Sequence, residues 1–180
     1  MGYRPGKAER TKAQLGEAII ALLATMSPDR VTAEAIAKRA GMGRATWFRH
    51  FSSKSDAVAC ALVARWKRWA AKEAPSLGPQ AGLLPFLRMV HGQKETIALL
   101  YARGMRQSVM DASTRFAETL VSGGQTGYRE KFYLYGFVGI LDEWVERGFA
   151  ETPEEVAALL DGFGGLVSHE PPQPAPEAST

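Results

Sequence analysis

Residues 30–58, RVTAEAIAKRAGMGRATWFRHFSSKSDAV, contain two short helical patterns that are separated by a glycine. Thr32 is suited to cap the first helix, because its hydroxyl can accept a hydrogen bond from a free N–H of the first turn. Gly41 supplies the positive φ that a tight turn between helices requires. The second pattern begins at Gly43 or Arg44 and runs to His50, and it contains few apolar residues. The stretch therefore predicts two consecutive short helices, the second with a large polar face.

Two short helices that meet at a glycine turn form a helix-turn-helix, in which the second helix enters the major groove of DNA. Ala37 is small where the two helices cross. The spacing of Ile36, Ala40, Met42 and Trp47 predicts a small core between them. We expect the rest of the second helix to be polar because it faces DNA.

The charge of the chain is unevenly distributed. Residues 1–72 contain 14 Lys and Arg against 5 Asp and Glu, a net charge of +9. Residues 73–180 contain 8 against 14, a net charge of −6. This asymmetry is typical of a polyanion-binding module attached to a body that does not bind polyanions, although a chance imbalance of surface charge gives the same count.

Several other classes of protein are disfavoured by the sequence. It contains neither a run of 18 apolar residues nor a signal-peptide pattern, so we expect a cytoplasmic protein that binds no membrane. The single cysteine and three scattered histidines predict no structural metal. No G-x-S-x-G, P-loop, H-E-x-x-H or G-x-G-x-x-G motif is present, so we expect neither an enzyme nor a bound cofactor.

Helical periodicity continues along the chain, and no strand pattern or internal repeat is evident. Pro and Gly residues between 75 and 82 predict a boundary. We expect an all-α protein of about nine helices: a helix-turn-helix domain over 1–54, a connecting helix over 54–72, a second domain over 73–168 and a disordered Pro-rich tail over 169–180. The predicted helices cover 10–26, 33–39, 44–50, 54–72, 83–89, 95–101, 109–120, 128–147 and 153–167.

The segment Thr32 to Val58 resembles the helix-turn-helix of TetR-type (TetR/AcrR) transcriptional regulators. Gly41, Thr46, His50-Phe51 and Ser53-Lys54 fall at the spacing of that family, and the segment Trp144 to Val156 is similar to its last two helices. The chain differs from the family in two places: Gly43 replaces a common Ser, and Phe48 replaces a Tyr that commonly contacts the DNA backbone.

The resemblance implies binding to double-stranded DNA, and residue chemistry suggests how. Arg44, Ala45 and Arg49 are candidates for base contacts, because arginine can pair with guanine through two hydrogen bonds. Arg49 is an equally good phosphate contact. His50 either contacts the backbone or packs on Phe51. The predicted DNA-binding residues are Thr32, Arg44, Ala45, Thr46, Phe48, Arg49, His50 and Lys54. A basic arm, Arg4, Lys7, Arg10 and Lys12, either lies along the duplex or only solubilises the end.

The resemblance also implies a homodimer, in which the last two helices of each copy form a four-helix bundle. The alternative is a monomer that buries the same aromatic side chains internally. The predicted interface residues are Tyr135, Phe137, Leu141, Trp144, Leu159 and Phe163.

A third implication is a small-molecule effector bound among the middle helices. An apolar pocket with few polar groups is typical of such a site, although methionine and aromatic residues more commonly fill the core. The predicted pocket residues are Trp66, Trp69, Phe86, Met89, Tyr101, Arg103, Met105, Met110 and Phe116. The sequence thus predicts a repressor that an effector releases from a palindromic operator. The alternative is a helical ligand-binding or interaction protein that reads no DNA.

Overall fold

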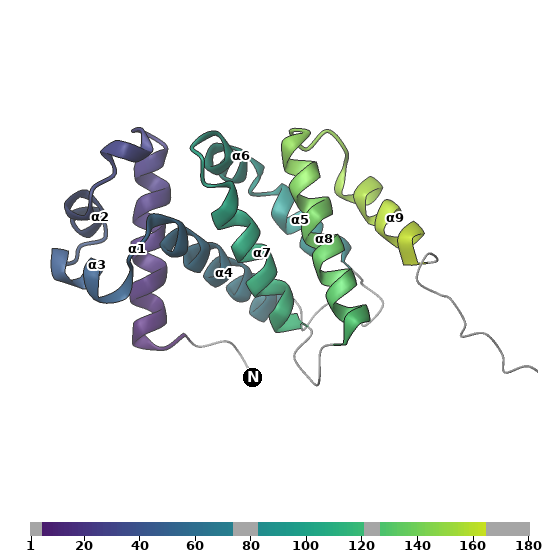
Figure 1. Ribbon diagram of the computed structural model, residues 1–180, viewed down its shortest axis with the longest axis horizontal. Helices are drawn as coiled ribbons and strands as arrows, with labels where there is room; N and C mark the ends of the chain where they lie inside the picture. The colour runs from purple at the N-terminus through teal and green to yellow at the C-terminus, as the bar shows by residue number, and fades with distance from the viewer. Residues whose placement is uncertain (1–4, 74–82, 121–126, 165–180) are drawn as a thin grey trace, which may run out of the picture.

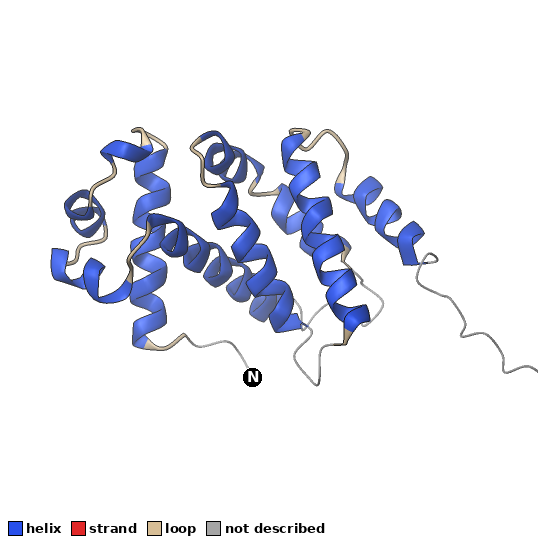
Figure 2. Cartoon of the chain, in the orientation of Figure 1, coloured by secondary structure: helices blue, strands red, loops and turns tan. Residues whose placement is uncertain are grey.

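The computed structural model describes residues 5–73, 83–120 and 127–164, and these ranges are all-α (Figure 2). They contain nine α-helices, one 3₁₀ turn (Pro28–Arg30) and no strand, which confirms the predicted fold class. The helices are α1 (Lys7–Leu23), α2 (Ala33–Arg39), α3 (Arg44–His50), α4 (Lys54–Glu73), α5 (Leu84–His91), α6 (Lys94–Ala102), α7 (Arg106–Leu120), α8 (Tyr128–Glu146) and α9 (Pro153–Gly164).

The helices form two groups that share α4 (Figure 1). We call α1, α2 and α3 the head, and α5 to α9 the body. In the head, α2 packs on both α1 and α3. In the body, α7 packs on α6 and α8, and α5 packs on α9. Because α4 contacts α1 along one side and α7 along the other, it connects the two groups mechanically.

The head rests on α4 through a very close approach of two backbones. A Cβ atom placed on Gly16 of α1 would overlap the carbonyl oxygen of Ala57 and lie 2.7 Å from the Cβ of Ala61. Beside this contact, Arg65 of α4 forms a bidentate ion pair with Glu17, its Nε donating to Oε1 at 2.6 Å. Only glycine permits helices to pack at this distance, so Gly16 fixes how the head sits on α4.

The turn between α2 and α3 has the predicted geometry. Gly41 adopts a φ of +67°, and the N–H groups of Gly41 and Met42 donate to carbonyl oxygens in the last turns of α2. At the other end of α2, the Thr32 hydroxyl accepts a hydrogen bond from the N–H of Ala35 at 3.2 Å. Both ends of this seven-residue helix are therefore fixed by the residues that the sequence indicated.

Helix boundaries differ most from the prediction in α1. The helix begins at Lys7 rather than Arg10, because the Glu9 carboxylate accepts a hydrogen bond from the N–H of Gly6 and so stabilises an earlier start. It ends at Leu23, and Met26 packs against the core from the following turn. The predicted boundary at 75–82 and the predicted tail at 169–180 lie outside the described residues.

The capping signals of α4 and α9 are confirmed by hydrogen bonds. The Ser53 hydroxyl accepts from the N–H of Asp56 at 3.1 Å. The Thr152 hydroxyl accepts from the N–H of Glu155 at 3.2 Å, and the Glu155 carboxylate accepts from the N–H of Thr152 at 2.8 Å. These caps explain why both starts could be predicted to within a residue.

We expect Gly16→Ala to lower the free energy of unfolding by about 2 kcal/mol, because the added methyl group forces α1 away from α4. Urea unfolding at a fixed protein concentration measures this change. Gln14→Ala is the control, since Gln14 is exposed on the same helix and its loss should change stability by less than about 0.5 kcal/mol. Equal effects of the two substitutions would contradict the close contact.

Candidate nucleic-acid interface

Helix α3 has one buried side and one exposed side. Trp47 is only 5% exposed and packs against Phe51, with 5.6 Å between the ring centroids. Arg44, Ala45, Phe48 and Arg49 are exposed together on the opposite side. The assignment of Trp47 to a small core is thus confirmed, and Phe51 packs in the same core. The exposed side contains three of the residues expected to meet DNA bases.

Phe48 gives the exposed side of α3 an unexpected feature. It is 60% exposed, and the guanidinium carbon of Arg44 lies 5.4 Å from the centre of its ring. A cation over an aromatic face is attracted by the negative charge of the ring. Phe48 lacks the phenol hydroxyl that the family commonly has here, but its ring restricts the orientation of Arg44. This contact could be expected from the sequence, because Arg44 and Phe48 are four residues apart and therefore lie on the same face of the helix.

An open groove joins α3 to the start of α1. It has a volume of about 480 Å³, and its polar or charged lining residues are Lys7, Thr11, Thr46, Arg49 and His50. Arg49 and Lys7 form no ion pair within the part of the chain that the structure describes. The groove is therefore cationic, and it brings three of the predicted DNA-binding residues together. In the described residues His50 has no ring contact with Phe51, so it lines this groove rather than the core.

The place of Thr11 in the lining of this groove was not predicted from the sequence. The predicted α1 began at Arg10, which left Lys7 and Thr11 off a common helix face. The earlier start puts them four residues apart on one face. The capping pattern Gly6-x-x-Glu9 was the signal that could have identified this start. Of the predicted basic arm, Arg4 lies outside the described residues.

Lys54 has a different environment from the one expected. Its ammonium donates to the carbonyl oxygens of Pro28 at 2.5 Å and Val31 at 3.3 Å. The side chain ties α4 to the segment before α2 in this structure, and the predicted DNA contact of Lys54 stays a prediction. Thr32 also has an internal role as the cap of α2, although its hydroxyl stays exposed.

Most of the predicted effector pocket is filled by its own side chains. Trp66, Phe86 and Phe116 are buried and pack in mutual contact, with ring centroids 5.1 to 5.8 Å apart. Met105 is buried too, while Trp69 and Met89 are partly buried against the same core. In this structure these residues form the centre of the body rather than an open pocket. Their place in an effector site stays a prediction.

A small cavity remains beside this aromatic cluster. It has a volume of about 10 Å³ and is bounded by Trp66, Tyr101 and Met110, among other residues of α4 to α8. That volume holds roughly one water molecule. The indole N–H of Trp66 is buried and has no hydrogen-bond acceptor within the described residues. Arg103 does not line this cavity.

Polar groups close the cavity on one side. The Tyr101 hydroxyl donates to Asp142 at 2.7 Å, and Arg106 donates to both oxygens of the same carboxylate. Hydrogen bonding by Arg106 lowers the pKa of Asp142, while burial and the hydrogen bond to Asp142 raise the pKa of Tyr101. At neutral pH Asp142 is a carboxylate held between the neutral phenol of Tyr101 and the guanidinium of Arg106. The three residues together connect α6, α7 and α8.

The residues of the predicted dimer interface, on α8 and α9, differ in burial. Phe137, Leu141 and Trp144 are 8%, 5% and 2% exposed, so they pack in the chain's own core. Their assignment to an interface stays a prediction. Tyr135 and Leu159 are 60% and 55% exposed. The side chain of Phe163 lies outside the described set.

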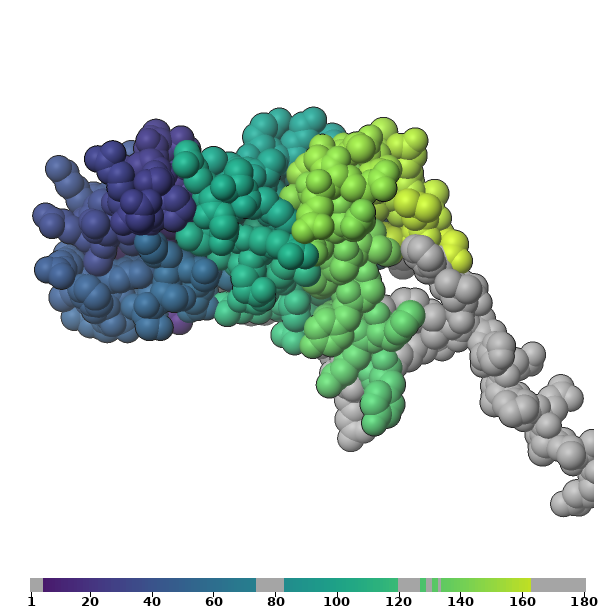
Figure 3. Space-filling model, turned by 45° about the horizontal axis from the view of Figure 1, so that its top comes forward, coloured from purple at the N-terminus to yellow at the C-terminus, as the bar shows by residue number. Residues whose placement is uncertain are grey.

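Two further aromatic residues extend the exposed side of α8. Tyr128 is 96% exposed, and Phe132 is exposed like Tyr135. The three residues recur at one turn of helix, and Gly136 and Gly139 lie exposed on the same helix. Figure 3 shows the first turns of α8 projecting from the body. We call Tyr128, Phe132 and Tyr135 the exposed aromatic face.

Two other observations limit the kind of site. No helix among the described residues is long and apolar enough to cross a membrane. Nor do the described residues contain a group of three His, Cys, Asp or Glu side chains arranged to hold a metal ion.

Comparison with known families supports the interpretation of the head and extends it to the body. Residues 15–59 match the model of bacterial regulatory proteins of the tetR family, and residues 79–163 match the model of a transcriptional regulator C-terminal region. No curated protein matches the chain closely enough to count as a relative. The first match covers α2, α3 and their turn, and the second covers α5 to α9. The chain therefore belongs to the TetR family of DNA-binding transcriptional regulators.

Proposed function

We propose that this regulator is a repressor that reads a palindromic operator and is released from it by a small-molecule effector. The observation that carries the proposal is the exposed side of α3, where Arg44 and Arg49 lie on one helix face beside a cationic groove. In this proposal Arg44 reads a base edge, and the groove holds the adjacent phosphates. The reading unit is residues 1–54.

Dimerisation is part of the proposal because one seven-residue helix contacts few base pairs. Two copies related by a two-fold axis would read two half-sites about 34 Å apart, one turn of the duplex. The exposed aromatic face supports this arrangement, since large apolar residues that are exposed together often mark an interface. Gly136 and Gly139 would permit close approach of a second α8.

The effector would bind between α4, α7 and α8, where the small cavity and the unpaired Trp66 N–H are found. An occupant larger than water requires the aromatic cluster to open, which would shift α4. Because α4 also supports the head, that shift would change the separation of the two α3 helices. The effector must then bind more tightly to one of the two separations of the α3 helices than to the other. Coupling between an effector site and a DNA-binding site typically amounts to about 1–3 kcal/mol.

We expect Arg44→Ala to weaken binding to the preferred duplex by about tenfold to a hundredfold, because a lost bidentate base contact costs about 1–3 kcal/mol. Fluorescence anisotropy against preferred and scrambled duplexes measures this loss. Preference between the two should fall as well. Lys94→Ala is the control, since Lys94 is exposed on α6 in the body. An unchanged preference in Arg44→Ala would exclude Arg44 as a reader of sequence.

Arg49→Ala distinguishes the two roles left open for Arg49. A phosphate contact would weaken binding to all duplexes alike and reduce the slope of log affinity against log salt by about one. A base contact would instead relax the preference at one position of the site.

Lys54→Met tests whether this lysine is structural. We expect a loss of about 2 kcal/mol in the free energy of unfolding, because two backbone carbonyls lose a charged donor. The salt dependence of DNA binding should stay unchanged. Lys38→Met, at an exposed position of α2, is the control for stability. A stable variant with a salt slope reduced by about one would return Lys54 to the phosphate contacts.

We expect Tyr135→Glu to convert the dimer to a monomer, because two carboxylates would be buried in a symmetric apolar interface. Sedimentation velocity over a range of concentrations measures the change, and an unaltered circular dichroism spectrum checks the fold. Lys94→Glu is the control, because it introduces the same carboxylate at an exposed position of α6. A dimer that survives Tyr135→Glu would place the interface elsewhere.

A further inference from the structure

Phe48 is an apolar side chain on the side of α3 that faces DNA in the proposed function. It is 60% exposed and lies outside the hydrophobic core that the described residues form. The centre of its ring is 5.4 Å from the guanidinium carbon of Arg44. Ala45, three residues before Phe48, is exposed on the same side, and its short side chain lets the helix approach a duplex closely. The helix therefore presents an aromatic ring directly beside its candidate base-reading arginine.

The chemistry of a phenyl ring limits what Phe48 can contact in a major groove. The side chain has no N–H, O–H or oxygen, so it forms no conventional hydrogen bond with a phosphate or with the edge of a base. Among the unmodified base pairs, the major groove presents one apolar group, the C5-methyl group of thymine. Contact with that methyl group removes apolar surface of both partners from water. Thymine is therefore the base that an exposed phenylalanine can distinguish from the other three.

The spacing of Phe48 and Arg44 limits which base pair the ring can reach. The two residues are four apart, so they are separated by about 6 Å along the helix axis. Successive base pairs of B-DNA are about 3.4 Å apart, so this distance spans about two base pairs. A helix that lies in the groove with Arg44 on a guanine thus places the ring within two base pairs of that guanine.

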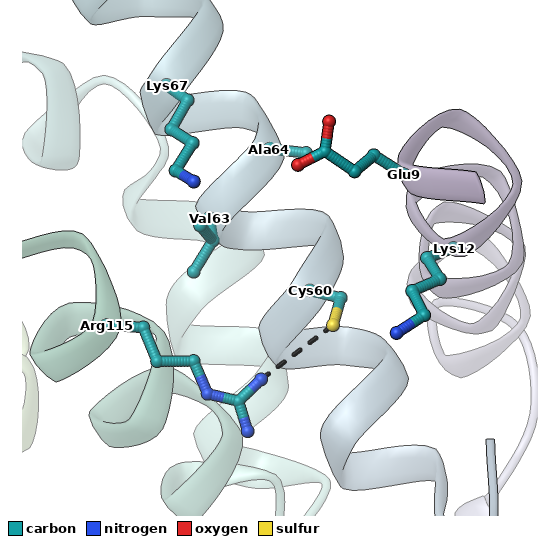
Figure 4. A pocket seen from close by; sticks show the side chains of 7 residues that line it. All are labelled: Glu9, Lys12, Cys60, Val63, Ala64, Lys67 and Arg115. Atoms are coloured by element: carbon teal, nitrogen blue, oxygen red, sulfur yellow. Dashed lines mark hydrogen bonds between the residues drawn. The ribbon is translucent and has the colours of Figure 1, made fainter. Parts of the chain in front are cut away.

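The cleft between head and body has a different character from the exposed side of α3 (Figure 4). It has a volume of about 270 Å³ and is lined by residues of α1, α4 and α7. Arg115 of α7 reaches across it, donating to the Cys60 sulfur at 3.7 Å and pairing with Asp56 at 2.8 Å. These contacts hold α7 to α4, so the cleft belongs to the junction of head and body. The ring of Phe48, by contrast, remains exposed.

We propose that Phe48 is a specificity-determining residue that contacts the C5-methyl group of a thymine within two base pairs of the guanine read by Arg44. The inference rests on the proposed function, because it requires α3 to lie in the major groove and Arg44 to read a base. It adds a second base to each half-site and assigns that base to an apolar contact rather than to a hydrogen bond.

Replacement of thymidine by deoxyuridine tests this contact, because the two nucleosides differ only in the C5-methyl group. The duplex is one that the protein selects from a random-sequence pool. The guanine read by Arg44 is the position at which Arg44→Ala relaxes the preference. Thymidines of one half-site are then replaced singly by deoxyuridine, and fluorescence anisotropy measures the affinity of the full-length protein. Thymidines outside the half-sites are the control positions.

One deoxyuridine within two base pairs of that guanine should weaken binding by about fourfold, the effect of removing one buried methyl group. In Phe48→Ala the same replacement should leave the affinity unchanged. Phe48→Leu, which keeps an apolar side chain, should retain part of the sensitivity. Leu83→Ala is the matched control, because it removes an exposed apolar side chain from the body and should show the full fourfold effect.

A ring that only orients Arg44 would give a different result. Phe48→Ala would then weaken binding to the thymidine and deoxyuridine duplexes by the same factor, and this outcome would overturn the proposal. So would a wild-type protein that binds both duplexes equally, a selected site without thymine in that window, or an unchanged preference in Arg44→Ala. A circular dichroism spectrum of each variant checks that it remains folded.

The same experiment separates this inference from the proposed function. If the protein selects no duplex, the reading of DNA by α3 fails, and the contact of Phe48 fails with it. If it selects a duplex and Arg44→Ala relaxes the preference, but the thymine methyl groups have no effect, only the contact of Phe48 is wrong.

Discussion

The contact of Gly16 with Ala57 is the constraint on which the rest of the structure depends. It brings the backbone of α1 against that of α4. The ion pair between Arg65 and Glu17 reinforces the contact from the side. Because α4 continues into the body and packs on α7, any displacement of α4 is transmitted to the head. A side chain at position 16 would push α1, and with it the head, away from α4.

The residues of α3 and the turn after it have two different roles. Trp47 and Phe51 build a core under α3, and the other side of the helix is left to cations and to Phe48. Phe48 illustrates how one substitution changes a role. Without a hydroxyl it makes no phosphate hydrogen bond, yet its ring restricts the neighbouring Arg44. A restricted arginine loses less conformational entropy when it pairs with a base.

Local signals explain most of what could be predicted from sequence. Gly41 marks the turn because its conformation disfavours other residues, and Thr32 and Thr152 mark helix starts because their hydroxyls satisfy nearby N–H groups. The predicted face of α3 followed from helical periodicity. These signals act within a few residues, so they need no knowledge of tertiary structure.

The surroundings that could not be predicted depend on contacts with other helices and loops. Trp144 faces the core because its indole donates to the Glu151 carbonyl in the loop before α9 and its ring stacks on His91 of α5. The aromatic residues of the predicted pocket fill one another's space, which periodicity cannot reveal. Lys54 bonds to carbonyls 23 and 26 residues away, and no spacing rule indicates such a pair.

The central claim is that α3 of two copies reads a symmetric DNA site. Its most direct test is selection of bound duplexes from a random-sequence pool, followed by sequencing and by measurement of the protein-to-DNA ratio. The account predicts enrichment of a palindrome whose half-sites lie about one helical turn apart, bound by two chains. Enrichment of no sequence, or of an asymmetric site occupied by a single chain, would contradict it.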